Sequence, residues 1–447
     1  MSTLHPADTP PRAEPVAQPA ASPMGPTPSR CASLDAVRGL AVLGILAMNI
    51  TSFASPSSAY MDPRVQGFAG VDRASWWIVH LLFDVKMMTI FSALFGAGIA
   101  LMADRALRAS GRPAVLHYRR MFWLLLVGLA HAYLLWYGDI LVLYALCGML
   151  VYPLRRLRPR TLIVLGLAIM LVTPLVNVAM GGGLTLMRGY AEGLERRQEQ
   201  GQTLTPDQER DLAGWHEIEK QFTTPPQRVE EEIAAHTTSY PAYLQHNARL
   251  AFWMQTKITL MWSIWRVTGL MLIGMALLKT GFLLGQAPPR LYLRLAAVGY
   301  AVGFPVVALG ALDLIRHDFD MVRGMLVSWH FNYVGSLLVS LAHASLVILA
   351  CLSGRAICRA LAPVGQMALT NYLFQSIVCV WVFAGFGAGL GLFNRLGRTE
   401  LLLFVAGVWV LQLILSPIWL KRYHFGPAEW AWRSLTYARP QPMLRAP

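Results

Sequence analysis

The residues of this chain whose types could support chemistry are ionisable side chains set inside or beside long apolar segments. His131 and Asp139 are eight residues apart, about two helical turns, so both are expected on one side of the chain. A histidine oriented by a carboxylate is the usual arrangement of a general base. The spacing therefore indicates a base for a hydroxyl or an amine. Two structural interpretations stay open: His131 packs against a carbonyl, or Asp139 only caps the next helix.

A second pair lies at the start of the first apolar segment. Asp35 and Arg38 are three residues apart, which places them on one helical face. The planar guanidinium of an arginine suits a phosphate or carboxylate, so this pair could bind an anionic group. It could equally be a salt bridge that fixes the first helix. Asn49 follows Arg38 by eleven residues, in the other half of the same segment.

Further polar residues lie deep in apolar segments and predict a buried polar cavity. They are His80, Asp84, Lys86, Arg266, Asn371 and Gln375. Such groups are costly in a membrane and usually face a partner or a cavity. His80 and Asp84 share a helical face, and a pair of this kind can handle protons. Ion pairing of Asp84 with Lys86 or Arg266 is the structural alternative, as are inter-helix hydrogen bonds of the two amides.

The composition shows which elements must position these side chains. Of the 447 residues, 55% are apolar and only 14% are charged, and the mean hydropathy is +0.46. Soluble proteins carry about 25% charged residues. Apolar runs of roughly 20 residues therefore predict an all-α, polytopic helix bundle in a lipid bilayer. We expect ten spans, at 34–54, 75–102, 119–137, 140–154, 161–180, 257–278, 291–312, 326–352, 363–385 and 400–420.

The distribution of arginine and lysine predicts the orientation of these spans. Alternate connections are rich in both residues, and the positive-inside rule places those connections in the cytoplasm. With ten spans, both termini are cytoplasmic. The net charge of +14 has the same explanation, so no nucleic-acid partner is expected.

The chain is expected to divide into five parts. They are a disordered Pro/Ala-rich tail at 1–29, five spans at 30–180, an extracytoplasmic insertion at 181–250, five spans at 251–438 and a short tail at 439–447. The insertion holds much of the acidic charge and should form two or three amphipathic helices. Within it, the pattern from Thr205 to Gln208 is typical of a helix start, with a threonine cap and a proline at the first position.

Metal and disulfide chemistry have no support in the sequence. The five cysteines are odd in number and include no CxxC pair, so neither a disulfide framework nor a zinc site is expected. No Walker loop, HExxH or GxSxG motif is present, which leaves ATPase, zinc-protease and α/β-hydrolase functions without a motif.

Several stretches resemble the YeiB-like membrane proteins, the family of domain of unknown function 418. They are the opening helix at 33–41, the segment at 91–96, the hairpin from 128 to 144, and the C-terminal stretches at 365–376 and 419–437. The chain is identified as a member of this family, which implies a multi-pass protein of the bacterial inner membrane. The opening helix is also similar to that of transmembrane acyltransferases, in which a histidine often follows the arginine by eleven residues. Arg38 matches that arginine, but Asn49 stands at the histidine position, so the base must come from elsewhere.

The leading hypothesis is therefore a membrane acyltransferase. Arg38 and Asp35 would bind the anionic part of a donor such as acyl-coenzyme A, a co-substrate, with no tightly bound cofactor. His131 with Asp139 would activate a small-molecule or glycan acceptor, while Asn49 would hold the acyl carbonyl.

Two other functions stay open. A small-molecule permease could use His80, Asp84 and Arg266, and a non-catalytic scaffold could use the 181–250 segment to bind partners. A homo-oligomer is compatible with each function.

Overall fold

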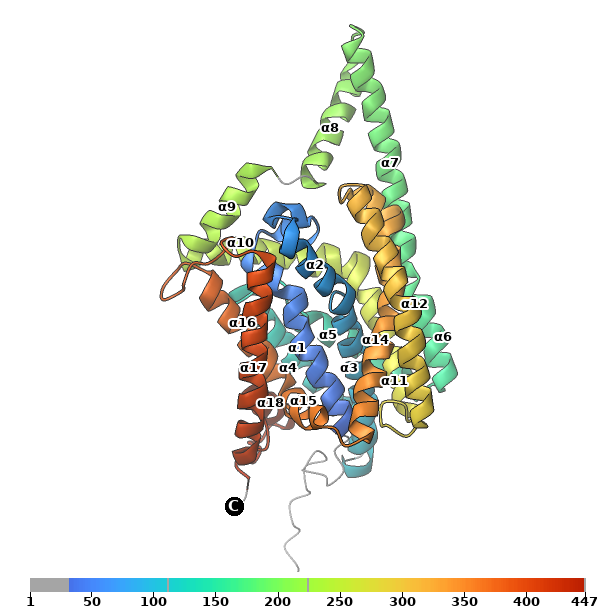
Figure 1. Ribbon diagram of the computed structural model, residues 1–447, viewed down its shortest axis with the longest axis vertical. Coiled ribbons are helices and arrows are strands. Elements are labelled where there is room, and N and C mark those ends of the chain that lie inside the picture. The colour runs from blue at the N-terminus through green and yellow to red at the C-terminus, as the bar shows by residue number, and fades with distance from the viewer. Residues whose placement is uncertain (1–31, 111, 223–224, 446–447) are drawn as a thin grey trace, which may run out of the picture.

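The computed structural model describes residues 32–110, 112–222 and 225–445 (Figure 1). Helices make up 82% of the structure, and the described residues form no strand. This confirms the predicted all-α fold.

The bounds of the helices follow the chain. They are α1 (Ala32–Ala54), α2 (Gly70–Leu82), α3 (Lys86–Ser110), α4 (Pro113–Leu134), α5 (Leu141–Val151), α6 (Pro159–Met170), α7 (Val172–Glu199), α8 (Pro206–Phe222), α9 (Pro226–Thr237), α10 (Tyr240–Trp253), α11 (Ile264–Lys279), α12 (Pro289–Arg316), α13 (Met321–Arg323), α14 (Trp329–Leu352), α15 (Ala356–Gln366), α16 (Ala368–Phe383), α17 (Arg398–Arg422) and α18 (Pro427–Tyr437). Short 3₁₀ turns lie at η1 (Ser57–Tyr60), η2 (Pro63–Gln66) and η3 (Tyr152–Arg156), and π-helical turns lie at η4 (Met254–Ser263) and η5 (Gly324–Ser328).

All ten expected apolar segments coincide with helices of the bundle. Among the described residues, seven helical stretches are long and apolar enough to cross a membrane, or eight if the pair α15 and α16, bent by 78°, is one span. The other two expected spans correspond to α4 and α5. Helix α5 has only 11 residues, about 16 Å, against a hydrocarbon thickness of about 30 Å. The protein is thus a multi-pass membrane protein, while the count of ten stays a prediction.

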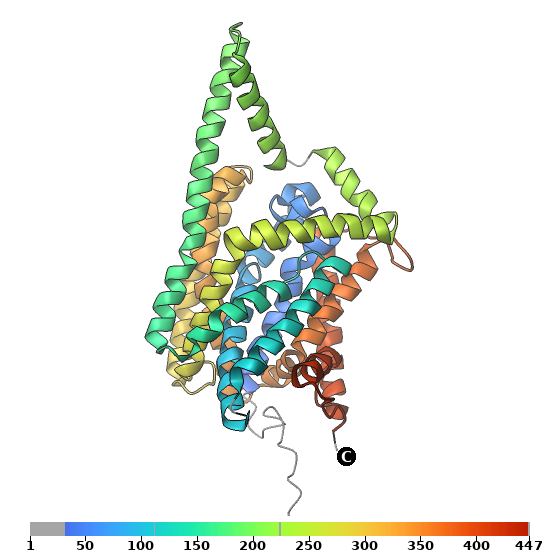
Figure 2. The ribbon, with the colours of Figure 1, turned by 180° about the vertical axis from the view of Figure 1, so that it is seen from behind.

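The first and last helices of the described chain, α1 and α18, reach the same end of the bundle. Figure 1 shows the start of α1, helices α15 and α18, and the C-terminus at the same end. The hairpin of α7 and α8 projects from the opposite end, as Figure 2 also shows. This arrangement agrees with an even number of spans.

Helix α7 crosses the boundary expected between the fifth span and the insertion, and the position of that boundary stays a prediction. Helix α7 runs without a break from Val172 to Glu199, so residues 181–199 continue the helix of the span. The sequence becomes polar in this stretch, but no proline interrupts it, and a helix can therefore extend beyond the apolar region.

The predicted start of the next helix is confirmed. The Thr205 hydroxyl accepts a hydrogen bond from Gln208 N at 3.3 Å, and Gln208 Oε1 accepts one from Thr205 N at 3.0 Å. This reciprocal capping box begins α8. The insertion then returns to the bundle through α9 and α10, where the His236 ring stacks on Phe393 at 3.8 Å.

Small residues allow close contact between central helices. Helices α1 and α15 meet at Gly39 and Gly365, and α3 and α11 meet at Gly96 and Gly274; an added Cβ at any of these would overlap the facing backbone. Glycine at such crossings is typical of membrane bundles, where packing replaces the hydrophobic effect.

One pair of cysteines differs from the sequence-based expectation. Cys351 and Cys358 form a disulfide, with their Cα atoms 5.1 Å apart. The chain reverses between them at Gly354, whose φ of +67° suits glycine. A spacing of seven residues carries no signature of such a turn, so the pair could not be identified from the sequence.

Candidate active site

The turn between α4 and α5 brings the predicted histidine and carboxylate together. His131 lies in the last turn of α4, and its Nδ1 is 2.8 Å from Asp139 Oδ2. The other oxygen, Asp139 Oδ1, accepts from Val142 N at 2.8 Å in the first turn of α5. Asp139 thus both contacts the imidazole and caps α5, so the cap does not exclude the predicted histidine–carboxylate pair.

A serine from a distant helix completes the arrangement. Ser376 Oγ on α16 is 2.9 Å from His131 Nε2, although the two residues are 245 positions apart. The side chains of His131 and Asp139 are 1% and 0% exposed, and Ser376 is 1% exposed. No local pattern could have predicted this contact, because only the packing of α16 on α4 creates it.

These three residues have the geometry of a carboxylate–imidazole–hydroxyl triad. With Asp139 accepting the Nδ1–H proton, the neutral imidazole presents the lone pair of Nε2 to the serine hydroxyl. A serine in this position can be activated as a nucleophile. The competing acceptor, Tyr372 O, is 3.4 Å from Ser376 Oγ and is therefore the weaker partner.

A second side chain of α16 borders the triad. The Tyr372 ring centroid is 5.1 Å from that of His131. Its buried hydroxyl lies beside the backbone of Ile140 and donates to no described acceptor. Tyr372 precedes Ser376 by four residues on the same helical face, so its ring and hydroxyl border the His131–Asp139 pair.

Helix α10 covers the end of α4 that carries the histidine. Tyr243 OH donates to Leu135 O at 2.5 Å, and Asn247 Nδ2 donates to Ala132 O at 2.8 Å. Carbonyls in the last turn of a helix lack intrahelical partners. The insertion therefore supplies the partners that α4 needs and closes the site from that side.

The predicted donor-binding pair forms as an ion pair. Arg38 NH1 is 2.8 Å from Asp35 Oδ1, and the arginine side chain is 26% exposed. It also lies 3.5 Å from Gly365 O. The guanidinium is thus braced from one side and accessible from the other.

Helix α1 gives the depth of the triad relative to this pair. Gln375, the neighbour of Ser376, donates from Nε2 to Val42 O at 3.2 Å. Val42 is four residues beyond Arg38, about 6 Å along the helix axis. The Gln375 amide group, next to Ser376 in the chain, thus lies about one helical turn deeper than Arg38. Asn49 lies further along α1, is 9% exposed, and is not hydrogen bonded to the triad.

A separate polar cluster lies where α2 and α3 are interrupted. The break spans 83–85, and Val85 has φ +63°. Asp84 Oδ2 is 3.3 Å from His80 Nδ1 and accepts from Asn332 Nδ2 at 2.9 Å. Asn332 Oδ1 in turn accepts from Lys86 Nζ at 2.6 Å. The carboxylate is therefore linked to the lysine through an amide and not directly.

Arg266 belongs to the same region but does not pair with Asp84. Its NH2 donates to Thr89 Oγ1 at 3.0 Å and to Ser336 Oγ at 2.7 Å, and NH1 donates to Tyr333 O at 3.0 Å. The π-helical turns η4 and η5 end just before Arg266 and Asn332. Such turns are frequent at functional sites.

The other two residues expected in this cavity lie elsewhere, which corrects the prediction. Asn371 Nδ2 donates to Ser416 Oγ at 3.1 Å, and Gln375 Nε2 donates to Gln412 Oε1 at 2.9 Å. These amides join α16 to α17, as the structural alternative predicted. The spacing within one helix could not show that the two amides face α17.

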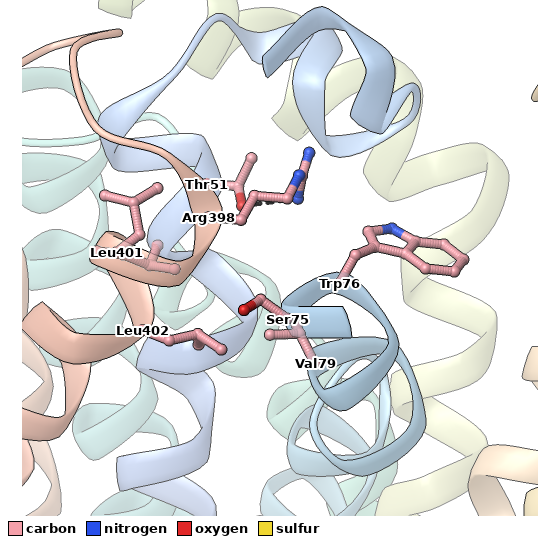
Figure 3. Close-up of a pocket in the computed structure, with 8 residues that line it drawn as sticks. Thr51, Ser75, Trp76, Val79, Arg398, Leu401 and Leu402 are labelled. Atoms are coloured by element: carbon pink, nitrogen blue, oxygen red, sulfur yellow. Dashed lines mark hydrogen bonds between the residues drawn. The ribbon is translucent and has the colours of Figure 1, made fainter. Parts of the chain in front are cut away.

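A small pocket lies behind the cluster. It is lined by residues that include Thr51, Ser75, Trp76 and Arg398 (Figure 3) and has room for about one water molecule. Trp76 separates it from the cluster, because its ring stacks on His80 at 4.8 Å. The pocket is too small for a substrate.

No group of three metal-binding side chains lies together in the part of the chain that the structure describes. The expected absence of a metal stays a prediction.

Comparison with known proteins identifies relatives over nearly the full length. The family described as "Protein of unknown function (DUF418)" matches residues 277–439. The chain is 33% identical to "Uncharacterized protein YeiB" of Escherichia coli over 425 residues, 93% of this chain and 98% of YeiB. It is 28% identical to "Uncharacterized protein YxaH" of Bacillus subtilis over 437 residues, 94% of this chain and 97% of YxaH. No solved structure matches. At this identity and coverage, the chain belongs to the DUF418 family that includes YeiB.

Proposed function

We propose that this protein is a membrane-embedded acyltransferase with Ser376 as nucleophile, His131 as base and Asp139 as the residue that orients the base. The observation that supports the proposal is the pair of hydrogen bonds, 2.8 and 2.9 Å long, that joins the three side chains. The same order of carboxylate, imidazole and hydroxyl performs acyl transfer on unrelated folds.

The reaction takes place in two halves. Ser376 Oγ attacks the carbonyl carbon of a thioester while its proton moves to His131 Nε2; the C–S bond breaks, and the thiolate leaves with that proton. An acyl-serine ester remains. The acceptor hydroxyl or amine then gives its proton to Nε2 and attacks the ester, and Ser376 Oγ takes the proton back. The acyl group moves without oxidation or reduction.

Two further contacts fit this chemistry. Arg38, braced by Asp35, would hold the anionic part of acyl-coenzyme A, about one helical turn from the level of the Gln375 amide group beside Ser376. The Tyr372 hydroxyl, which donates to no described acceptor, would donate to the developing oxyanion. It takes the carbonyl-binding role that the sequence assigned to Asn49.

The buried triad requires a movement for access. Helix α10 closes the α4 end of the site through side-chain bonds to carbonyl groups, so displacement of α10 would admit the acceptor. The proposed setting is a bacterial inner membrane, with the donor on the Arg38 side and the acceptor on the side of the insertion.

Trapping of the acyl-enzyme tests the proposal. Purified protein in liposomes is incubated with radiolabelled acetyl-coenzyme A or palmitoyl-coenzyme A, and peptides are examined for an ester at Ser376. We expect label in the wild type and none in Ser376→Ala. Ser345→Ala is the matched control, because Ser345 is also fully buried, on α14. Equal labelling of both variants would refute the nucleophile.

A second function, a permease, is favoured by the interrupted helix. Lys86 is 0% exposed and Arg266 is 4% exposed, and both lie near a helix break, an arrangement found at the substrate sites of transporters. This region holds two cations, Lys86 and Arg266, and one carboxylate, Asp84. The excess of positive charge suits an anionic solute. Uptake of radiolabelled lactate or phosphate into proteoliposomes tests it: Asp84→Asn should abolish uptake and leave the acyl-serine unchanged. Absence of uptake for every anion tried, with an intact acyl-serine, would favour the transferase alone.

A further inference from the structure

A second pocket lies at the end of the bundle where α1 begins. It is formed by the end of α3, the start of α4, the η3 turn and the end of α11. Its free volume is about 260 Å³, a little below the roughly 300–1,000 Å³ of small-molecule sites. It is distinct from the triad and from the α2–α3 cluster, neither of which contributes a residue.

Three cationic side chains surround this pocket, with one acid. The cations are Arg155, Arg156 and Lys279, and the acid is Asp104. Arg155 donates to Tyr152 O at 2.9 Å and lies over that ring at 3.8 Å. Lys279 Nζ donates to Leu157 O at 2.8 Å. These contacts position the two side chains and leave most of their N–H donors available.

The balance of charge favours an anionic ligand. None of the three cations forms an ion pair with a carboxylate in the described parts of the chain. The pocket therefore has a net charge of +2, from three cations and one acid. A doubly basic pocket with several N–H donors suits the oxygens of a phosphate group.

The remaining wall of the pocket is apolar and reaches the outside of the bundle. Ala100 and Leu107 of α3 belong to it, and Leu107 is 53% exposed. An amphiphile could place its phosphate between the cations and its hydrocarbon chain along this wall.

We propose that this pocket binds a phosphate group, with Arg155, Arg156 and Lys279 as its ligands. Basic pockets between helices at the cytoplasmic side of membrane proteins bind the headgroups of anionic lipids. The same chemistry would also accept a soluble phosphate ester. The site is independent of the proposed acyl transfer, so either can fail without the other.

Native mass spectrometry of the full-length protein tests the site, with phosphatidylglycerol, phosphatidylcholine and glycerol 3-phosphate as probes. The test variant is Arg155→Gln/Arg156→Gln/Lys279→Gln. The matched control is Arg158→Gln/Arg160→Gln/Arg290→Gln, which removes the same charge from exposed positions near the same end but outside the pocket. At about fivefold per cationic residue, the test variant should bind phosphatidylglycerol on the order of 100-fold more weakly. The control should keep the affinity of the wild type.

Asp104→Asn keeps the proposal testable if the triple variant does not fold. Removal of this acid should tighten binding of phosphatidylglycerol about fivefold. Binding of phosphatidylglycerol over phosphatidylcholine with this residue dependence would support a lipid headgroup, and binding of glycerol 3-phosphate with the same dependence but no lipid preference would support a soluble ester. Equal losses in the test and control variants, or no effect of Asp104→Asn, would overturn the phosphate site.

Discussion

The triad and the α2–α3 cluster are both buried polar sites, but the backbone that carries them differs. His131 and Ser376 lie on continuous helices, and Asp139 is tied to the first turn of α5. Asp84 instead lies in the three-residue break at 83–85, and its partner Asn332 follows the π-helical turn η5. Continuous, capped helices hold side chains in fixed geometry, which chemistry requires. Interrupted helices can rearrange, which transport requires.

The two sites also differ in charge. The triad has one acid, bonded directly to its histidine. The cluster has Lys86 and Arg266 against Asp84, with the Asn332 amide between the lysine and the carboxylate. The direct bond between His131 and Asp139 suits transfer of a proton. Lys86 and Asp84 are linked only through the Asn332 amide, so binding of a ligand or a proton could change how these two charges pair.

The largest expected effect is at the histidine of the triad. His131→Ala should lower single-turnover acyl transfer by about 10³-fold or more and leave donor binding unchanged, because the base acts after the donor has bound. Rapid-quench measurements with labelled donor report the first quantity, and equilibrium binding of coenzyme A reports the second. Asp139→Asn should cost less, because Asp139 orients the imidazole without taking up the proton, and an amide oxygen can still accept from Val142 N at the start of α5. If His131→Ala lowered the yield of folded protein but left acyl transfer unchanged, His131 would be a packing residue. The permease would then be the better supported function.

The cluster should respond in stability and not in transfer. Lys86→Met leaves the buried Asn332 oxygen and the His80 carbonyl without their donor, which should lower the free energy of unfolding by about 3 kcal/mol. Unfolding in micelles measures this loss. Lys257→Met, at an exposed position, is the control and should stay within about 0.5 kcal/mol. Equal stability of the two variants would show that the hydrogen bonds of Lys86 to Asn332 and to the His80 carbonyl do not stabilise the fold.

A smaller effect is expected at the donor-binding pair. Arg38→Lys keeps the charge but loses the planar fork, so coenzyme A should bind about tenfold more weakly, as for one lost hydrogen bond to a charged group. Calorimetric titration of the folded variant measures the change. If the affinity for coenzyme A were unchanged in this variant, the ion pair of Arg38 with Asp35 would have a purely structural role.

The smallest effect concerns the insertion that covers the triad. Burial lowers the pKa of His236 on α9 to about 4. A hydrogen bond to Glu232 O raises that pKa, but by less than burial lowers it. A histidine with a pKa below its unfolded value of about 6.5 stabilises the docked state above pH 6.5, and this stability is lost as the pH falls towards 4. Docking of α9 should weaken by about 1 kcal/mol between pH 7 and 5.5.

Hydrogen exchange of residues 226–237 at the two pH values, corrected for intrinsic rates, measures this change. His236→Gln should remove the pH dependence. If α9 opened equally at both pH values in the wild type, His236 would not hold it to the bundle.

Much of the fold could be predicted because local patterns determine it. Each apolar run became a helix, and the spacing of His131 and Asp139 predicted their contact, since both lie on one short hairpin. The extent of α7 could not be predicted, because the three glycines at 181–183 suggest a helix end that the structure does not have. Ser376 and Asn332 were missed as partners for a different reason: each meets its site from a helix distant in sequence, and only helix packing decides which face it presents.

The high burial of α1 has a consequence for how the protein is made. The hydrophobic window of α1 is 83% buried, whereas that of α17 is 28% buried. Yet α1 is synthesised first, and the helices α15 to α17 that pack on it leave the ribosome more than 300 residues later. During that interval the surface of α1 around Gly39, which packs on α15, and the neighbouring Asp35–Arg38 pair lack their α15 partners. We therefore expect the folded yield in the cell to depend on an insertase that shelters this surface until translation ends.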